Sequence, residues 1–95
     1  MTYWVYILYS SSANKYYIGQ TENLSERIEQ HNNGFFSNSS TKYGIPWILN
    51  YVIECSCRKQ ALAIERHIKK MKSRKYLNDL KIYPEISVRL KKMYS

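Results

Sequence analysis

The sequence has few cysteines. Only two occur in 95 residues, Cys55 and Cys57. They stand too close together, at the end of an expected strand, for an ordinary structural disulfide, and one C-x-C pair is a weak metal signal. We therefore expect two reduced thiols that take no part in function.

Long apolar segments are also missing. No run of about 18 apolar residues occurs, so no transmembrane helix and no membrane contact are expected. The first residues, MTYWVYIL, lack the basic region and the cleavage site of a signal peptide. The chain length allows one modest core. These absences predict a single-domain cytoplasmic protein.

Acidic residues are scarce in the C-terminal part. Residues 56–95 contain twelve Lys and Arg against three Asp and Glu, whereas residues 1–55 contain three basic and four acidic residues. Lys and Arg gain affinity for a polyanion by releasing counterions from its phosphates. A solvated helical surface has the same composition, so charge alone leaves nucleic-acid binding open.

The apolar pattern predicts an α+β fold in the order ββαβα, followed by further helices. Asn23 and Glu26 form a capping-box pattern before the first helix, and Ser73 is the expected cap of the third. Strands are expected at residues 3–10, 16–20 and 47–54, helices at 24–33, 58–72, 74–81 and 86–93, and a long loop at 35–46. We expect a main domain at residues 1–82 and a basic helical extension at 83–95, packed on that domain or trailing from it.

Two polar side chains flank the apolar face of the first expected helix. On a helical wheel, Arg27 and His31 extend the stripe formed by Leu24 and Ile28. A charged guanidinium beside a buried face is costly unless an anion meets it. This placement therefore indicates an anion at the sheet-facing side of the helix.

Glu65 is the only acidic residue between positions 56 and 78. It can form an ion pair with Lys69, four residues later. It can equally serve as a Mg²⁺ ligand, since hard cations take oxygen donors and often keep only one or two protein carboxylates. Together with Tyr6 and Tyr17 on neighbouring strands, and Arg27, these residue types match the base, cation and metal ligand that phosphodiester hydrolysis needs.

With these motifs in order, the sequence resembles the GIY-YIG endonuclease superfamily, in particular its small single-domain bacterial members. Trp4-Val5-Tyr6 corresponds to the first motif, with Trp4 in place of its glycine, and Tyr17-Ile18-Gly19 is the second. The segments NLSERIEQHNNG, STKYGIPW and ALAIERHIKKMKSRKY resemble the family's first helix, its loop and its glutamate-bearing helix. The resemblance implies a small three-stranded antiparallel sheet flanked by helices, and metal-dependent cleavage of DNA.

The resemblance also implies a role for each site residue. Tyr6 would act as general base or relay the proton from water, and Tyr17 would bind the scissile phosphate or position the water. Arg27 would stabilise the charge that develops on the phosphate. His31 would orient or help to deprotonate a tyrosine. Glu65 would hold one Mg²⁺ or Mn²⁺ ion.

Further residues are expected around this site. Gly19 would allow close backbone packing. A free tyrosine has a pKa of about 10, so a tyrosine base needs a nearby cation or metal to lower it. The residues expected to contact DNA are Thr41, Lys42, Lys69, Lys70, Lys72, Arg74 and Lys75.

The leading hypothesis is a metal-dependent DNA endonuclease, favoured as a monomer. Its selectivity would be low or directed at DNA structure, with branched or single-stranded DNA among the candidates, and its role would lie in repair or recombination. The alternative is a nucleic-acid-binding module with little or no catalysis. A third reading is a small interaction protein whose basic helices dock an acidic partner.

Overall fold

The fold is known from a computed structural model that describes residues 2–33 and 44–95. Within these residues a three-stranded antiparallel sheet is flanked by four helices, which confirms the expected α+β class. The elements are β1 (Tyr3–Ser10), β2 (Lys15–Thr21), α1 (Leu24–Asn32), β3 (Ile48–Cys55), α2 (Arg58–Met71), α3 (Arg74–Ile82) and α4 (Pro84–Met93).

The strand order is β2-β1-β3, so the first strand is central and β2 forms an edge. In the β1–β2 register Tyr6 pairs with Gly19, and Leu8 pairs with Tyr17. Directly paired residues of an antiparallel ladder lie on the same face of the sheet. The register therefore brings Tyr6, Gly19 and Tyr17 to one face.

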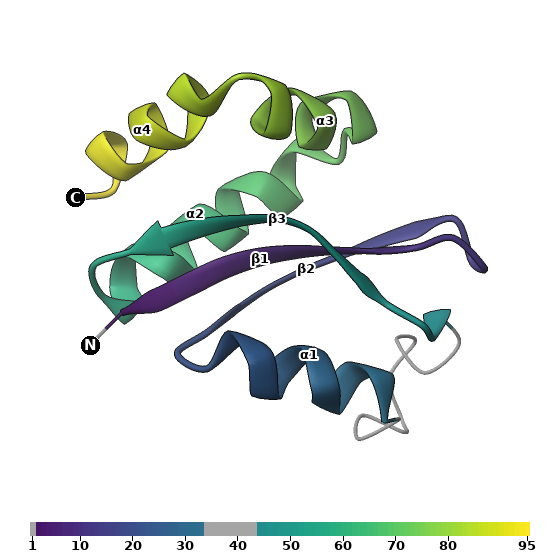
Figure 1. Cartoon of the computed structure of the whole chain (residues 1–95). Helices are drawn as coiled ribbons and strands as arrows, with labels where there is room; N and C mark the ends of the chain where they lie inside the picture. The colour runs from purple at the N-terminus through teal and green to yellow at the C-terminus, as the bar shows by residue number, and fades with distance from the viewer. Residues whose placement is uncertain (1, 34–43) are drawn as a thin grey trace.

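Each face of the sheet has its own apolar core. Figure 1 shows α1 on one side of the sheet and α2, α3 and α4 on the other. The smaller core, on the α1 side, consists of Tyr6, Leu8 and Trp47, with Tyr17, Leu24 and Ile28 packed against it. The larger core on the opposite side includes Val5, Ile7, Ile53, Ile64, Ile68, Leu77, Leu80 and Leu90. The predicted site therefore sits in the smaller core, between the sheet and α1.

The helix starts follow the capping signals in the sequence. The Asn23 side chain accepts a hydrogen bond from the Glu26 backbone N–H at 3.1 Å and donates one to the Glu26 carboxylate at 3.0 Å. The Ser73 hydroxyl likewise accepts from the Tyr76 N–H at 3.1 Å. These bonds satisfy donors that a helix start leaves unpaired, and both predicted caps are confirmed. The last helix begins at Pro84 rather than Ile86, because proline suits the first turn of a helix.

The last helix, α4, packs on the same body as the rest of the chain. Leu90 is 2% exposed and belongs to the larger core. Side-chain bonds also join α4 to the sheet and to α2: the hydroxyls of Tyr51 and Ser87 lie 2.8 Å apart, and the Gln60 amide donates to the Lys91 carbonyl at 3.1 Å. These contacts are consistent with a C-terminal segment that packs on the main domain.

The described residues contain neither a disulfide nor a membrane-spanning helix. Cys55 is buried, Cys57 is exposed, and the two form no disulfide in the structure. No helix between residues 2 and 33 or 44 and 95 has the length and apolar character needed to span a membrane.

Candidate active site

A buried hydrogen bond links β1 to α1 at the centre of the site. His31 lies one turn after Arg27, and both side chains lean toward the sheet because residues four apart share a helix face. The hydroxyl oxygen of Tyr6 lies 3.2 Å from Nε2 of His31. Each of these two residues is 1% exposed, so the bond is shielded from water.

The protonation states of this pair follow from burial. Burial, and secondly the positive charge of Arg27, lower the pKa of His31 to about 4, so the imidazole is neutral at neutral pH. Burial also raises the pKa of Tyr6, and the Tyr17 phenol adds to the rise, while the charge of Arg27 and its hydrogen bond act the other way. The expected lowering by Arg27 is thus present but weaker than burial. The Tyr6 hydroxyl keeps its proton and can donate it to a neutral imidazole nitrogen.

Tyr17 forms the second wall of the site. Its ring centroid lies 6.3 Å from that of Tyr6 and 4.6 Å from that of His31. The ring of Trp47 contacts it edge-on, with the centroids 6.3 Å apart. Tyr17 is half-buried whereas Tyr6 is fully buried, so a ligand from solvent reaches Tyr17 first.

Arg27 acts on every titratable group of this cluster. Its charge lowers the pKa values of Tyr6, Tyr17 and His31 relative to burial alone. The side chain is half-buried and lines two polar pockets, of about 250 and about 150 Å³, beside the start of α1. A guanidinium in this position can meet an anion from solvent while it contacts the buried groups.

Glu65 reaches the cluster from the other side of the sheet. After burial, the negative charge of this carboxylate is the largest cause that raises the pKa of Tyr17, and it also raises that of Tyr6. Because β2 is an edge strand, a side chain on α2 can lie close to Tyr17 past that edge. The Glu65 side chain is 18% exposed and lies 3.8 Å from Nζ of Lys69, so the predicted ion pair also forms.

Gly19 gives the site close backbone packing. A Cβ atom at this position would lie 2.6 Å from Cζ of Tyr6, closer than real Cβ contacts. The glycine therefore leaves room for the Tyr6 ring on the neighbouring strand.

The donor set suits a divalent cation held chiefly by substrate and water. Among the described residues no group of three or more His, Cys, Asp or Glu side chains gathers as a metal cluster. Mg²⁺ often uses one or two carboxylates and otherwise keeps waters and substrate phosphates. A single, largely buried Glu65 carboxylate fits that requirement, so Glu65 can serve as the protein ligand of such an ion.

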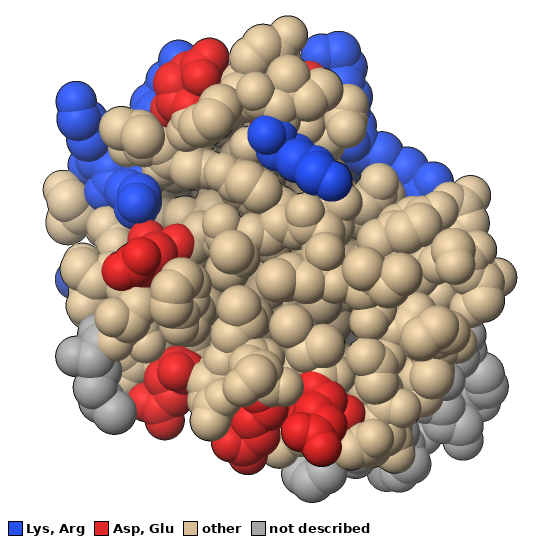
Figure 2. Space-filling view, in the orientation of Figure 1, with Lys and Arg blue, Asp and Glu red and all other residues tan. Residues whose placement is uncertain are grey.

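The residues expected to contact DNA do not all lie together. Lys69, Lys72 and Arg74 line one pocket, whereas Lys70 lines a different one on α2. Lys75 is exposed and forms an ion pair with Asp79 at 3.0 Å. Thr41 and Lys42 lie outside the described residues. Figure 2 shows Lys and Arg over the helices opposite α1, while acidic side chains gather along the α1 edge.

Two cations beside the site were missed in the sequence. Arg58 lines a pocket together with Arg27, and Lys15 lines the pocket of Lys69 and Lys72. Neither belongs to a motif or to a dense basic run. Their position near the site follows only from the packing of α2 against β2, for which no local signal exists.

Comparisons with known proteins show similarity to one family and to one solved structure. A family model described as the GIY-YIG catalytic domain matches residues 2–78. The solution NMR structure of the UPF0213 protein BH0048 from Bacillus halodurans is similar at 26% identity, with a TM-score of 0.52, and the match covers 84% of this chain and 82% of that one. A comparison with curated protein sequences gives no significant match.

Proposed function

The chain belongs to the GIY-YIG family, and from that premise we propose that it is a divalent-metal-dependent endonuclease that hydrolyses DNA phosphodiester bonds. The observation that carries the proposal is the cluster of Tyr6, His31 and Tyr17, with the Glu65 charge raising the pKa of both phenols. It supports one site that combines a carboxylate, the Arg27 guanidinium and two phenols. A hydrolase acting on phosphate uses such groups as metal ligand, cation and proton acceptor.

Tyr6 and His31 provide the proton acceptor in this proposal. The Tyr6 hydroxyl is protonated, and a neutral imidazole nitrogen lies 3.2 Å from it. As the Tyr6 oxygen takes a proton from the attacking water, it passes its own proton to Nε2 of His31. A free phenolate is then not required, but the proton now charges His31, and burial disfavours that charge too, so the anionic phosphate must stabilise the imidazolium. This relay also explains how a tyrosine with a raised pKa can serve as a base.

The remaining groups bind and stabilise the phosphate. Tyr17, the more accessible phenol, binds a phosphate oxygen or orients the water, and Arg27 stabilises the charge that develops in the transition state. Glu65 is the residue that would hold Mg²⁺ or Mn²⁺. Such an ion, when bound, supplies polarisation of the phosphate oxygens.

Nicking of supercoiled plasmid and cleavage of branched DNA, each with and without Mg²⁺ or Mn²⁺, test the proposal. We expect metal-dependent cleavage that falls by about 100-fold or more in Glu65→Gln and in Arg27→Ala. The control is Glu54→Gln, the same chemical change at an exposed position on β3. Equal cleavage by all four proteins would reveal a contaminating nuclease and contradict the assignment.

A binding module that keeps the fold without cleaving is the second candidate. The observation that favours it is the complete burial of Tyr6, 1% exposed, whose hydroxyl must still meet a water. In that case all four proteins bind DNA with a steep salt dependence, and no metal leads to cleavage of any DNA form.

A further inference from the structure

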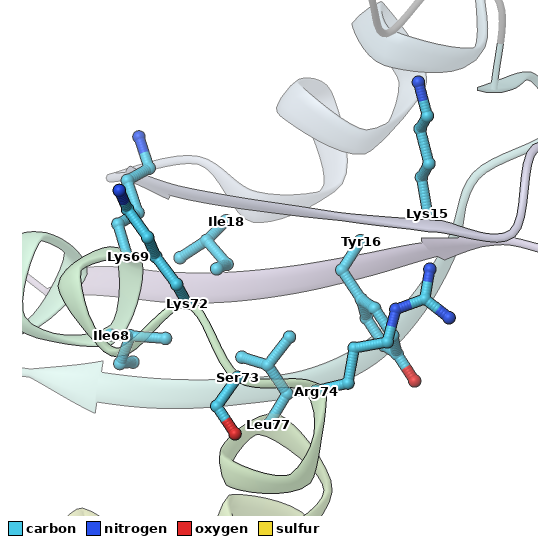
Figure 3. A pocket seen from close by; sticks show the side chains of 9 residues that line it. All are labelled: Lys15, Tyr16, Ile18, Ile68, Lys69, Lys72, Ser73, Arg74 and Leu77. Carbon is cyan, nitrogen blue, oxygen red and sulfur yellow. The ribbon is translucent and has the colours of Figure 1, made fainter.

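A basic pocket with an apolar floor lies on the α2 side of the sheet and includes Lys69, the ion-pair partner of Glu65. It has a volume of about 280 Å³ and lies between β2 and the junction of α2 with α3. Ile18, Ile68 and Leu77 form its apolar part. Figure 3 shows Ile18 and Leu77 between Lys69 and Lys72 on one side and Lys15 and Arg74 on the other, with Ile68 on the side of Lys69 and Lys72. Phosphate contacts alone would not require an apolar floor.

The pocket carries four cationic side chains and, among the described residues that line it, no acidic one. Lys15 and Lys72 are exposed, and the Lys69 side chain is 52% exposed, so their ammonium groups can meet an anion. The chemistry is that of a ligand with an apolar body and a negative charge. A nucleotide, with its base and its phosphate, is such a ligand.

Arg74 gives this pocket a fixed wall. Its guanidinium donates hydrogen bonds to the backbone carbonyl of Asn14 and, at 3.1 Å, to the side-chain oxygen of the same residue. It also lies over the Tyr16 ring, 5.5 Å from the centroid. These contacts join the β1–β2 turn to the start of α3, so the pocket exists before a ligand arrives.

Lys72 occupies a backbone conformation that favours glycine. It ends α2 with φ 46° and ψ 43°, in the left-handed region. Helices commonly end in this conformation with glycine, because a Cβ atom is strained there. A lysine at this position places a cation on the rim of the pocket at a cost in backbone strain, and such outliers often mark a function.

The pocket is adjacent to Glu65. Lys69 lines it and also lies 3.8 Å from the Glu65 carboxylate. Four residues along a helix advance about 6 Å along its axis. A strand whose phosphate contacts Glu65 can therefore reach the pocket within about one helical turn of that phosphate.

We propose that this pocket binds an unpaired nucleotide next to the scissile phosphate, with the base against Ile18, Ile68 and Leu77 and the flanking phosphates on Lys15, Lys69 and Lys72. A base inside a duplex is stacked on both faces and cannot pack on a protein floor. The volume is just below the usual range of small-molecule pockets, which begins at about 300 Å³, and suits one nucleotide. The substrate class is then DNA with a single-stranded segment. The choice of a DNA ligand rests on the proposed function.

Anisotropy of labelled oligothymidylate and of a labelled duplex, measured in EDTA, tests the pocket without any cleavage. We expect Lys15→Ala with Lys72→Gly to lose about 10-fold or more in affinity for the single strand, to lose less for the duplex, and to reduce the salt slope by about 1.4. Lys72→Gly alone should raise the melting temperature, because it relieves the left-handed strain. The control is Lys81→Ala, an exposed lysine on α3 that does not line the pocket. The inference would be overturned if the double variant lost no more affinity than Lys81→Ala, or if it lost as much affinity for the duplex as for the single strand.

Methyl NMR separates a nucleotide site from a phosphate site. Thymidine monophosphate should shift the methyl resonances of Ile18, Ile68 and Leu77, and inorganic phosphate should not. Shifts with both ligands, or with neither, would overturn the nucleotide pocket. If the protein cleaves DNA but these methyl shifts are absent, the pocket proposal is wrong and the endonuclease proposal is unaffected. If the shifts occur but no DNA form is cleaved, the endonuclease proposal is wrong and the pocket proposal is unaffected.

Discussion

The hydroxyl oxygen of Tyr6 lies 3.2 Å from Nε2 of His31, across the interface between the central strand and α1. Both side chains are buried, and their pKa values move in opposite directions, that of Tyr6 upward and that of His31 downward. Burial disfavours the charged form of each, and this is why the two shifts have opposite signs. The pair is therefore a neutral hydrogen bond that can pass a proton.

Removal of the Tyr6 hydroxyl should abolish cleavage at a moderate cost in stability. In Tyr6→Phe we expect the cleavage rate to fall about 100-fold or more. Unfolding should be easier by about 1–3 kcal/mol, because a buried hydrogen bond is lost. Plasmid nicking and urea denaturation measure the two effects. Tyr51→Phe is the matched control, since it removes a hydroxyl that lies 2.8 Å from Ser87, away from the site. Equal activity of both variants would contradict the role of Tyr6.

The stability of the protein should depend on His31 in acid. Its pKa is 6.5 when unperturbed and about 4 in the folded protein. As the pH falls from about 6.5 to about 4, the unfolded chain takes up a proton that the folded chain does not, so folding loses up to about 3 kcal/mol. Urea midpoints of the wild type and His31→Gln across this window measure the effect. If the difference in urea midpoint between the wild type and His31→Gln stays constant with pH, the predicted effect of His31 is wrong.

The pKa of Tyr17 should report the Glu65 charge. A nearby carboxylate disfavours the phenolate, so Glu65→Gln should lower the pKa of Tyr17 relative to the wild type. NMR titration of ¹³C-labelled tyrosine gives this value directly. Glu85→Gln, the same change at an exposed position on α4, is the control. An unchanged Tyr17 titration in Glu65→Gln would place the carboxylate away from the phenols.

An added methyl group at Gly19 should displace the Tyr6 ring. Because the new Cβ would lie 2.6 Å from Cζ of Tyr6, we expect Gly19→Ala to cost about 1–3 kcal/mol of stability and to lower the cleavage rate. Combination with Tyr6→Leu shows where the strain arises. If the ring is its source, the double variant is more stable than the sum of the single changes predicts. Strict additivity would assign the cost to another contact.

The last helix should unfold together with the rest of the domain. Leu90 is 2% exposed in the larger core, so Leu90→Ala should cost about 2–5 kcal/mol. The control is Val88→Ala on the same helix, which is 51% exposed and should change stability by no more than about 0.5 kcal/mol. Thermal unfolding followed by circular dichroism measures both. A Leu90 variant as stable as the control would mean that residues 83–95 are an independent extension.

Much of the fold could be predicted because its signals are local. The capping bonds of Asn23 and Ser73 each span three residues, so the sequence alone located both helix starts. Alternation along the first strand likewise separates Val5 and Ile7 from Tyr6 and Leu8, and the structure places these pairs in different cores. The end of β3 at Cys55 and the start of α4 at Pro84 differ from the predicted bounds by one and two residues. Helix and strand ends are commonly ambiguous over this range.

The sequence could not predict which cations of the basic surface line the same pocket. The cations after position 68 form one dense run in the sequence. In the structure Lys69 and Lys72 line one pocket, whereas Lys70, on the same helix as Lys69, lines another. Lys15 joins the first pocket from a distant strand. Neighbours in sequence point in different directions on a helix, and contacts between distant elements depend on how those elements pack.

By itself, the sequence determined the order of the elements, the family motifs, and the helix face that carries Arg27 and His31, because periodicity and spacing are written in the chain. Only the tertiary structure decided that the Glu65 charge raises the pKa of Tyr17, and that burial outweighs Arg27 in setting the pKa of Tyr6. These outcomes depend on distance and on loss of solvent, and both arise only when the helices close over the two faces of the sheet.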